Sequence, residues 1–384
     1  MFTKKAIKLR LETYLYQACC IALFFAVSPV AVAKTIPLNS NNIHVSGAGY
    51  IFRSPAKLFC KRFSDSLLGK RFSDSLLGLP PEERMFPIET ARSTSGIKIE
   101  FKTKSSKIRL TFTQEQGLHE KGYFGIMRDG IFYKAIPFNA TALYQTVEVV
   151  IDSLPVNKDC IYTVILPSYS NFSLTGLALD SNSKLSNYKP ERKKIYIAFG
   201  DSITHGRGQE GASYLTYPYL LSQKLNMELY NLGIGGSRIA LPIAKLASDL
   251  PKADVITILV GYNDFNGANK TVEQFEKEYR AFLSILRTKQ PKSSIFCISL
   301  LYTKKTENAK THATPAEFRA SLEKLIGDFK KEDKKLFLIP GEKITSLKNL
   351  QPGEDTDPVH LTITGAKLFA EELYNVILKS AVKT

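Results

Sequence analysis

The segment that decides the fold reads KIYIAFGDSITHG and covers residues 194–206. Its apolar, β-branched first half predicts a buried strand. The tripeptide Gly200-Asp201-Ser202 and the glycine at position 206 then predict a turn and a loop. In open α/β sheets, functional sites lie at the carboxyl ends of parallel strands. The segment therefore predicts that the hydroxyl of Ser202 is exposed at such a strand end.

Three further segments follow in the C-terminal half, each after a candidate strand or near the end of the chain. They read NLGIGGS at 231–237, GYND at 261–264 and DPVH at 357–360. Together with the first segment they resemble the four sequence blocks of the SGNH hydrolases, also called the GDSL esterase/lipase family. The resemblance covers about residues 193–384. It implies a three-layer α/β/α, flavodoxin-like hydrolase domain that acts on esters.

Acyl transfer requires a nucleophile, a base, a group that orients the base, and donors for the developing oxyanion. Ser202 is the candidate nucleophile, and histidine is the side chain best suited as a base near neutral pH. Of the five histidines, only His360 follows a carboxylate, Asp357, by three residues, so a tight turn stiffened by Pro358 can bring the carboxylate onto the ring. His205 lies on the same loop as Ser202 and is interpreted as a cleft-rim or solvated histidine.

The candidate oxyanion donors are the backbone N–H groups of Ser202 and Gly236 and the side-chain amide of Asn263. Ser202 is expected to begin a helix, whose first N–H groups bind anions. Gly236 lies in a glycine cluster that lets the backbone approach a ligand closely. The resemblance implies the same three positions. The alternatives are a plain tight turn at Gly236 and an Asx turn at Asn263, while Asp201 and Asp264 are expected to hold loops by accepting backbone hydrogen bonds.

Residues 1–33 are predicted to be a secretory signal peptide. A basic start precedes an apolar core at 21–30 and a small-residue cleavage site at 31–33. That core is shorter than the roughly 20 residues that a membrane span requires. We therefore expect a secreted or periplasmic protein, with an uncleaved N-terminal anchor as the alternative.

The mature chain is predicted to contain two domains. Residues 34–189 form an all-β domain with its linker, and residues 190–384 form the hydrolase domain. Short alternating strands are predicted at 96–101, 108–113, 146–151 and 161–166, which is typical of a sandwich. Residues 78–103 also resemble the jelly-roll-type domain attached to some secreted carbohydrate esterases. In the hydrolase domain, capping patterns at Thr271 and Thr314 predict helices.

The cysteines and histidines do not form a recognisable metal site. Cys60 and Cys160 could pair in an oxidising compartment, whereas Cys297 is predicted to be a small buried apolar residue. No Cys/His cluster has the spacing of a zinc site. We expect neither a metal ion nor a cofactor.

The charge of the chain bears on its partners. The formal net charge is +16, of which the first 33 residues contribute about +3, so about +13 remains without them. Such a charge would attract an anionic glycan or a cell-envelope surface. The favoured alternative is that the basic residues only aid solubility, because Asp and Glu are interspersed among them. No motif for nucleic acid is present, and we infer no stable protein partner.

The sequence also contains a tandem duplication. Residues 61–69, KRFSDSLLG, recur identically as residues 70–78. Two copies of nine residues are too few and too short for a repeat architecture. One copy is expected to belong to the fold and the other to form a surface insertion.

These features predict a secreted serine esterase that removes a short acyl group, acetyl above all, from a carbohydrate. Its expected partner is a small-molecule or polysaccharide ester substrate. An acyltransferase that moves acetyl to a glycan and a lysophospholipase or thioesterase are the alternatives. A catalytically inactive glycan-binding protein is a further one. The chain lacks tryptophan, so a bound sugar would have to stack on tyrosine or phenylalanine.

Overall fold

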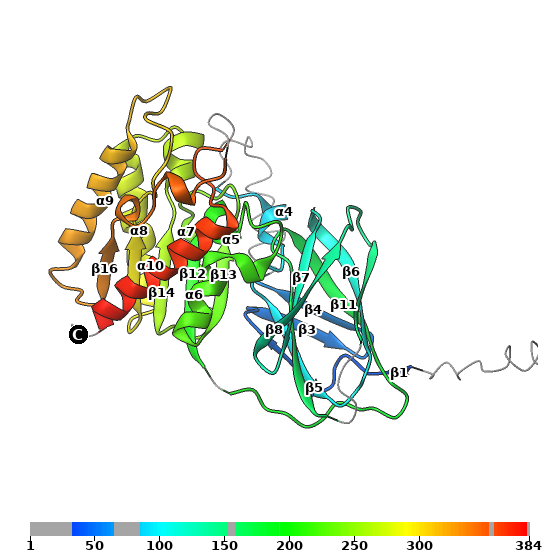
Figure 1. Cartoon of the computed structure of the whole chain (residues 1–384). Coiled ribbons are helices and arrows are strands. Elements are labelled where there is room, and N and C mark those ends of the chain that lie inside the picture. Colours follow the sequence, from blue (N-terminus) through cyan, green and yellow to red (C-terminus); the bar gives the residue numbers. More distant parts are fainter. Residues whose placement is uncertain (1–32, 65–84, 153–157, 192, 353–356, 382–384) are drawn as a thin grey trace, which may run out of the picture.

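An antiparallel β domain and a mixed α/β domain lie side by side in the protein (Figure 1). The structure is a computed structural model, and it describes residues 33–64, 85–152, 158–191, 193–352 and 357–381. The predicted signal peptide and the second copy of the duplication lie outside the described residues, apart from residue 33. In the part that is described, no helix is both long and apolar enough to cross a membrane.

The α/β domain is built on a parallel sheet of five strands. They are β12 (Lys194–Gly200), β13 (Met227–Gly233), β14 (Val255–Leu259), β15 (Ser294–Ile298) and β16 (Leu336–Ile339). Their order in the sheet is β13-β12-β14-β15-β16, and every neighbouring pair is parallel. This is the flavodoxin-like order 2-1-3-4-5. The predicted fold class of this domain is confirmed.

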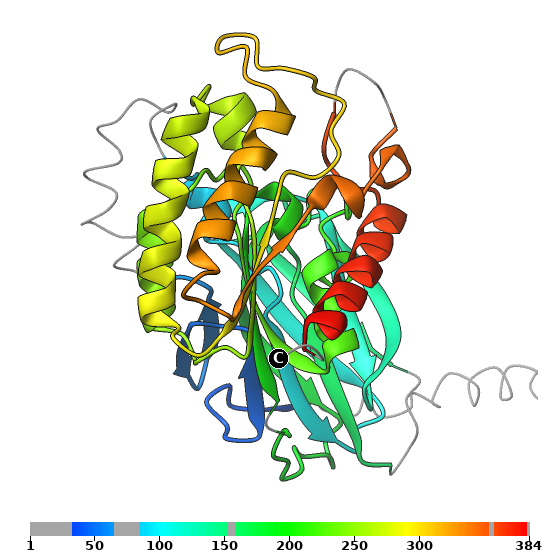
Figure 2. The ribbon, with the colours of Figure 1, turned by 90° about the vertical axis from the view of Figure 1, so that its left-hand side faces the viewer.

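Helices cover both faces of the parallel sheet, as the view in Figure 2 shows. On one face lie α6 (Tyr217–Leu225) and α10 (Ile363–Ala381), and on the other lie α7 (Leu241–Lys245), α8 (Val272–Lys289) and α9 (Pro315–Phe329). The helix α5 (Ser202–His205) follows β12. Shorter 3₁₀ turns cover Ser213–Leu215, Leu246–Ser248, Gly341–Lys343 and Leu347–Asn349, and a π-helical turn, η4, covers Asn263–Gly267.

The N-terminal ends of α8 and α9 are as the sequence predicts. Thr271 and Thr314 each form a complete capping box with the residue three positions later, Gln274 and Glu317. These reciprocal bonds satisfy backbone N–H groups that a helix start leaves without partners. The apolar face of α9, including Phe318, is buried in the core of the domain.

Two antiparallel sheets form the β domain. One contains β1 (Lys34–Thr35), β3 (Tyr50–Ser54), β4 (Lys57–Lys61), β6 (Ile108–His119), β9 (Thr146–Ile151) and β11 (Ser170–Leu179). The other contains β2 (Ile43–Ser46), β5 (Lys98–Thr103), β7 (Gly122–Arg128), β8 (Ile131–Phe138) and β10 (Cys160–Ile165). Alternating residues of both sheets share one apolar core, so the predicted sandwich is confirmed. Cys60 and Cys160 are both free and buried in this domain, so the disulfide that the sequence left open does not form.

The two domains share an apolar boundary. The short helix α4 (Ile88–Ala91) and the neighbouring Phe63 and Phe86 belong to the same cluster of buried residues as the parallel sheet. Residues between β4 and β5 of the β domain therefore contribute to the core of the α/β domain. The predicted boundary between 189 and 190 falls in the irregular stretch between β11 and β12.

Candidate active site

Ser202 stands just after the carboxyl end of the inner strand β12, as the first residue of α5. The carboxylate of Asp201 caps this helix by accepting the Ile203 N–H at 3.0 Å. A side chain at position 200 could not fit, because a Cβ there would lie 1.8 Å from the Thr204 hydroxyl oxygen. The sharp strand-to-helix turn that exposes Ser202 therefore requires Gly200. The predicted loop-holding role of Asp201 is confirmed.

A continuous chain of hydrogen bonds links Ser202, His360 and Asp357. The Ser202 Oγ lies 2.7 Å from His360 Nε2. On the other side of the ring, His360 Nδ1 lies 2.8 and 2.9 Å from the two carboxylate oxygens of Asp357. The Asp357 carboxylate also accepts the backbone N–H of His360 at 2.9 Å, which closes the turn between them. Because Nδ1–H donates to the carboxylate, Nε2 is left to accept the proton of Ser202.

The surroundings of His360 keep it in the neutral form. Burial lowers the pKa of His360, and the charge of Arg207 lowers it further. The Asp357 carboxylate opposes both effects and raises the pKa of His360. The net shift is downward, so the ring is able to accept a proton at neutral pH.

The predicted oxyanion donors lie on neighbouring loops at this edge of the sheet. Within the described part of the chain, the backbone N–H groups of Ser202 and Gly236 have no hydrogen-bond acceptor. Gly236 has a φ of +80°, a left-handed conformation that favours glycine. The Asn263 amide donates to the Ser237 carbonyl oxygen at 2.9 Å, which holds it beside the Gly236 turn and leaves it a second N–H.

Asp264 fastens these two loops to each other. Its carboxylate accepts the backbone N–H of Ile239 at 3.1 Å and pairs with the Lys270 ammonium at 2.6 Å. The predicted loop-holding role of Asp264 is confirmed. The bond from Asn263 to the Gly236 loop crosses between two segments, so the alternative of a local Asx turn at Asn263 is not what the structure contains.

The prediction that His205 is a cleft-rim or solvated histidine is wrong. Its side chain is fully buried, and it stacks on the Tyr169 ring with centroids 4.1 Å apart. Its Nε2 lies 2.7 Å from both the Ser93 hydroxyl and the Ser168 carbonyl oxygen. These three partners come from the β domain, whose packing against α5 covers His205.

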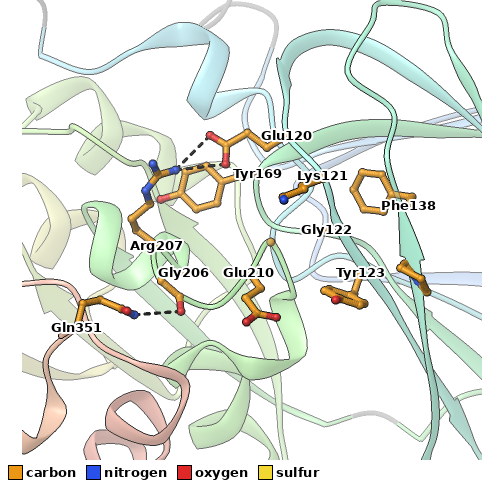
Figure 3. A pocket seen from close by; sticks show the side chains of 13 residues that line it. Glu120, Lys121, Gly122, Tyr123, Phe138, Tyr169, Gly206, Arg207, Glu210 and Gln351 are labelled. Carbon is orange, nitrogen blue, oxygen red and sulfur yellow. Dashed lines mark hydrogen bonds and ion pairs between the residues drawn. The ribbon is translucent and has the colours of Figure 1, made fainter. Parts of the chain in front are cut away.

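A cavity of about 720 Å³ lies between the two domains (Figure 3). Its walls are charged, aromatic and glycine-rich, and consist of Glu120, Lys121, Gly122, Tyr123, Pro137, Phe138, Tyr169, Gly206, Arg207, Gly208, Glu210, Gly211 and Gln351. Two residues of the cavity wall donate backbone hydrogen bonds to Ser202 and His360. The Arg207 N–H donates to the Ser202 carbonyl oxygen, and the Gln351 N–H donates to the His360 carbonyl oxygen, both at 2.9 Å.

An ion pair joins the domains at the rim of this cavity. The Arg207 guanidinium lies 3.2 Å from the Glu120 carboxylate and also over the ring of Tyr169. Sequence analysis missed the whole β-domain wall, because none of its residues stands in a motif. Only Arg207 offered a signal, since it directly follows the segment that contains Ser202. Among the described residues, no group of three or more His, Cys, Asp or Glu side chains is arranged to hold a metal ion.

The comparison with protein families decides what this domain is. Residues 198–368 match the model of the GDSL-like Lipase/Acylhydrolase family. The α/β domain belongs to this family. The GDSL-like domain makes the protein an ester hydrolase, in agreement with its predicted class. A search of curated protein sequences returned no match.

Solved structures with the same fold cover both domains. A salicylyl-acyltransferase from a tetracycline biosynthetic pathway has a TM-score of 0.76 and 21% identity, over 91% of this chain and 98% of that chain. An acetyl xylan esterase from the rumen bacterium Butyrivibrio proteoclasticus has a TM-score of 0.60 and 13% identity over the same shares. A family two carbohydrate esterase from Clostridium thermocellum, in complex with cellohexaose, has a TM-score of 0.59 and 18% identity, over 75% of this chain and 94% of that chain. At these identities the likeness is one of fold.

Proposed function

We propose that the protein hydrolyses short acyl esters, acetyl esters above all, on a carbohydrate, and that Ser202, His360 and Asp357 form its catalytic triad. The observation that carries this proposal is the unbroken hydrogen-bonded chain from the Ser202 hydroxyl through His360 to Asp357. That arrangement is the one by which a serine hydroxyl becomes a nucleophile.

The reaction proceeds in two halves. Ser202 Oγ attacks the ester carbonyl carbon while His360 Nε2 takes the hydroxyl proton, and the N–H groups of Ser202, Gly236 and Asn263 stabilise the oxyanion. His360 then gives this proton to the departing alcohol as the carbon–oxygen bond breaks, which leaves acyl-Ser202. A water molecule attacks the acyl group, His360 takes its proton, and collapse of the second oxyanion releases the acid and returns the proton to Ser202.

The cavity between the domains supports a carbohydrate as the alcohol part of the ester. Its tyrosine and phenylalanine rings offer flat apolar faces, and its charged and amide groups offer partners for hydroxyl groups. The resemblance in fold to a carbohydrate esterase determined with cellohexaose and to an acetyl xylan esterase points the same way.

The preference for a short acyl group rests on the four sequence blocks, between which the sequence contains no long apolar insertion that could bury a fatty chain. Each methylene buried in a fitting apolar pocket stabilises a complex by about 0.8 kcal/mol, so a site for long chains would give a kcat/KM that rises with chain length. We expect the opposite for p-nitrophenyl esters, with acetyl best and a steep fall by butyryl or hexanoyl. Acetylated polysaccharides assayed in parallel should release acetate, and Ser202→Ala is the control for both assays. A maximum at eight carbons or more would assign the protein to the lipases, lysophospholipases or thioesterases.

Acyl transfer is the second candidate. The cavity could hold an acceptor alcohol where water otherwise attacks, and the salicylyl-acyltransferase has the same two-domain fold. The test adds a free sugar to the acetyl ester assay and measures acetylated sugar against acetate. Acetylated sugar in excess of acetate at millimolar acceptor would make transfer the main activity.

Export of the protein is part of the proposal. Its support is the basic, apolar and small-residue pattern of residues 1–33. N-terminal sequencing of the exported protein should begin at Lys34. An intact Met1 in a membrane fraction would favour the uncleaved anchor.

A further inference from the structure

Arg62, the residue after β4 of the β domain, is almost completely buried at the domain boundary. Among the described residues, six oxygens lie within hydrogen-bond distance of its guanidinium, and all six are neutral. These are the carbonyls of Thr90, Ala91, Ser93, Asn231 and Gly233 and the hydroxyl of Ser93, at 2.6 to 3.3 Å. Burial lowers the pKa of Arg62 to about 9. Burial of a cation is costly, and the described residues place no carboxylate against the Arg62 guanidinium, so the retention of Arg62 calls for a role.

The carbonyls that Arg62 binds include the last residues of β13. Gly233 ends this strand. Gly235 and Gly236 lie in the loop that follows, which is called the oxyanion loop here because it presents a candidate oxyanion donor, the Gly236 N–H. The Arg62 Nη1 lies 3.0 Å from the Asn231 oxygen and 2.6 Å from the Gly233 oxygen. Arg62 therefore ties the β domain to the base of the oxyanion loop.

His205 holds the next residues of the same loop. Its Nδ1 accepts the backbone N–H of Gly235 at 3.1 Å, so the ring proton lies on Nε2 and is donated toward the Ser168 carbonyl oxygen. The Ser93 hydroxyl gives its own proton to the Thr90 carbonyl and accepts from Arg62, at 2.8 and 2.9 Å. Its oxygen lies 2.7 Å from His205 Nε2 and shares the Nε2 proton with the Ser168 carbonyl oxygen, so it connects the two side chains.

The short helix α5 contains both the candidate nucleophile, Ser202, and the histidine that holds the oxyanion loop, His205. α5 begins at Ser202 and ends at His205, so the distance between nucleophile and oxyanion loop is set through one turn of helix and one hydrogen bond. Among the residues that the structure describes, no carboxylate is a hydrogen-bond partner of His205, whose ring contacts the hydroxyl of Ser93, the carbonyl of Ser168, the N–H of Gly235 and the ring of Tyr169. His205 is therefore suited to hold the loop and not to exchange protons with a substrate.

We propose that Arg62, Ser93 and His205 are positioning residues through which the β domain holds the Gly235-Gly236 loop in register with Ser202. This inference rests on the proposed function, because the loop matters for catalysis only if Gly236 stabilises an oxyanion. The β domain then contributes to the chemical step itself, in addition to its wall of the cavity.

Two variants of His205 separate the loop contact from the rest of the side chain. His205→Asn keeps an acceptor near the position of Nδ1, whereas His205→Gln keeps a polar group near Nε2 and loses the acceptor for Gly235. Both lose the ring that stacks on Tyr169. With p-nitrophenyl acetate and active-site titration, we expect His205→Gln to lose about 10- to 100-fold in kcat with KM within about twofold, since a displacement of about 1 Å costs up to about 10²-fold. His205→Asn should lose less than about threefold.

Arg62→Lys provides the second test, with Arg53→Lys as its matched control. Lysine has one ammonium, which cannot reach both the oxygens of Ser93 and the carbonyl oxygens of β13. We therefore expect kcat to fall about tenfold at constant KM. Arg53 also donates to backbone carbonyls, those of Ser40 and Ile43, but inside the β domain. Arg53→Lys should leave kcat unchanged.

Amide hydrogen exchange tests the positioning independently of activity. In His205→Gln, a peptide that covers residues 232–240 should exchange faster at Gly235 than in the wild type or in His205→Asn, while the peptides of β6 and β11 stay protected. If the wild type hydrolyses no ester but this difference in exchange is found, the proposed function fails while the holding of the loop stands. Wild-type kcat in both His205→Gln and Arg62→Lys, equal losses in the two His205 variants, or unchanged exchange at Gly235 would overturn the inference.

Discussion

Two histidines lie near Ser202, and their environments differ. His360 bonds to the Ser202 hydroxyl, whereas His205 bonds to the loop that contains Gly235. His360 bonds to the Ser202 hydroxyl and to a carboxylate, and about a quarter of its side chain is exposed, at 23%. His205 is fully buried, and its partners within the described ranges are a hydroxyl, a carbonyl and a backbone N–H. Both pKa values are lowered by burial, that of His205 far more.

The difference shows what makes a histidine a base. The Asp357 carboxylate favours the protonated ring of His360, which in the proposed mechanism is the form that arises when Ser202 gives up its proton. The charges that act on His205 are those of Arg62 and Arg207, and both lower its pKa. Protonation there would place a cation beside other cations in a buried site. His360 can therefore exchange protons, whereas His205 serves as a fixed acceptor.

Asp357→Asn should have the largest effect, because it removes the carboxylate that distinguishes the two histidines. We expect kcat to fall by about 10⁴-fold, the usual result of losing the orienting aspartate of a serine triad. Steady-state hydrolysis of p-nitrophenyl acetate measures it, and circular dichroism checks the fold. The control is Asp328→Asn, which breaks an exposed ion pair with Lys331 at the same sequence spacing. A loss below about tenfold would mean that His360 does not need its partner.

Asn263→Ala should have the next largest effect, on the oxyanion side of the site. Loss of one oxyanion donor costs about 10²- to 10³-fold in kcat, and the same substitution also frees the Ser237 carbonyl. Asn266→Ala, in the same π-helical turn, should remain within about twofold of the wild type. If the two variants behave alike, the Asn263 amide does not face the reacting carbonyl.

Arg207→Gln should shift the pH profile rather than abolish activity. The rate requires neutral His360, so it rises with pH through the pKa of His360 and then levels off. The Arg207 charge lowers that pKa. Its removal should therefore raise the pKa and move the acid limb of kcat to higher pH, with a change below about tenfold at any one pH. Lys121→Gln, another cation of the cavity wall, is the control, and an acid limb that stays in place or moves to lower pH would contradict the prediction.

Deletion of residues 70–78 should have no measurable effect on activity or on the melting temperature. The two copies of the duplication are identical, so this deletion yields the same polypeptide as deletion of residues 61–69. Either way one Lys-Arg-Phe-Ser segment follows β4, and it supplies the buried Arg62 and Phe63. Thermal unfolding and kcat of the purified variant check this. An insoluble or inactive product would mean that both copies are packed into the fold.

Local sequence patterns predicted the environment of His360 more fully than that of His205. Asp357 and His360 are three residues apart, so the turn that joins them is a local property, and the capping boxes at Thr271 and Thr314 are local in the same way. His205 is equally close to Ser202 in sequence but was misjudged. Its environment depends on Ser93, which is 112 residues away in the β domain.

The sequence by itself determined which residues are chemically able to form the proposed triad, the alternation that makes one domain a sandwich, and the parallel strands that present Ser202. Each of these follows from spacing along a single segment. Only the tertiary structure decided that Ser202 meets His360 across 158 residues, and that Arg62 reaches the end of β13 across 169. The reason is physical: burial and long-range hydrogen bonds depend on which surfaces pack together. A polar residue that is solvated in one packing becomes a buried link between two domains in another.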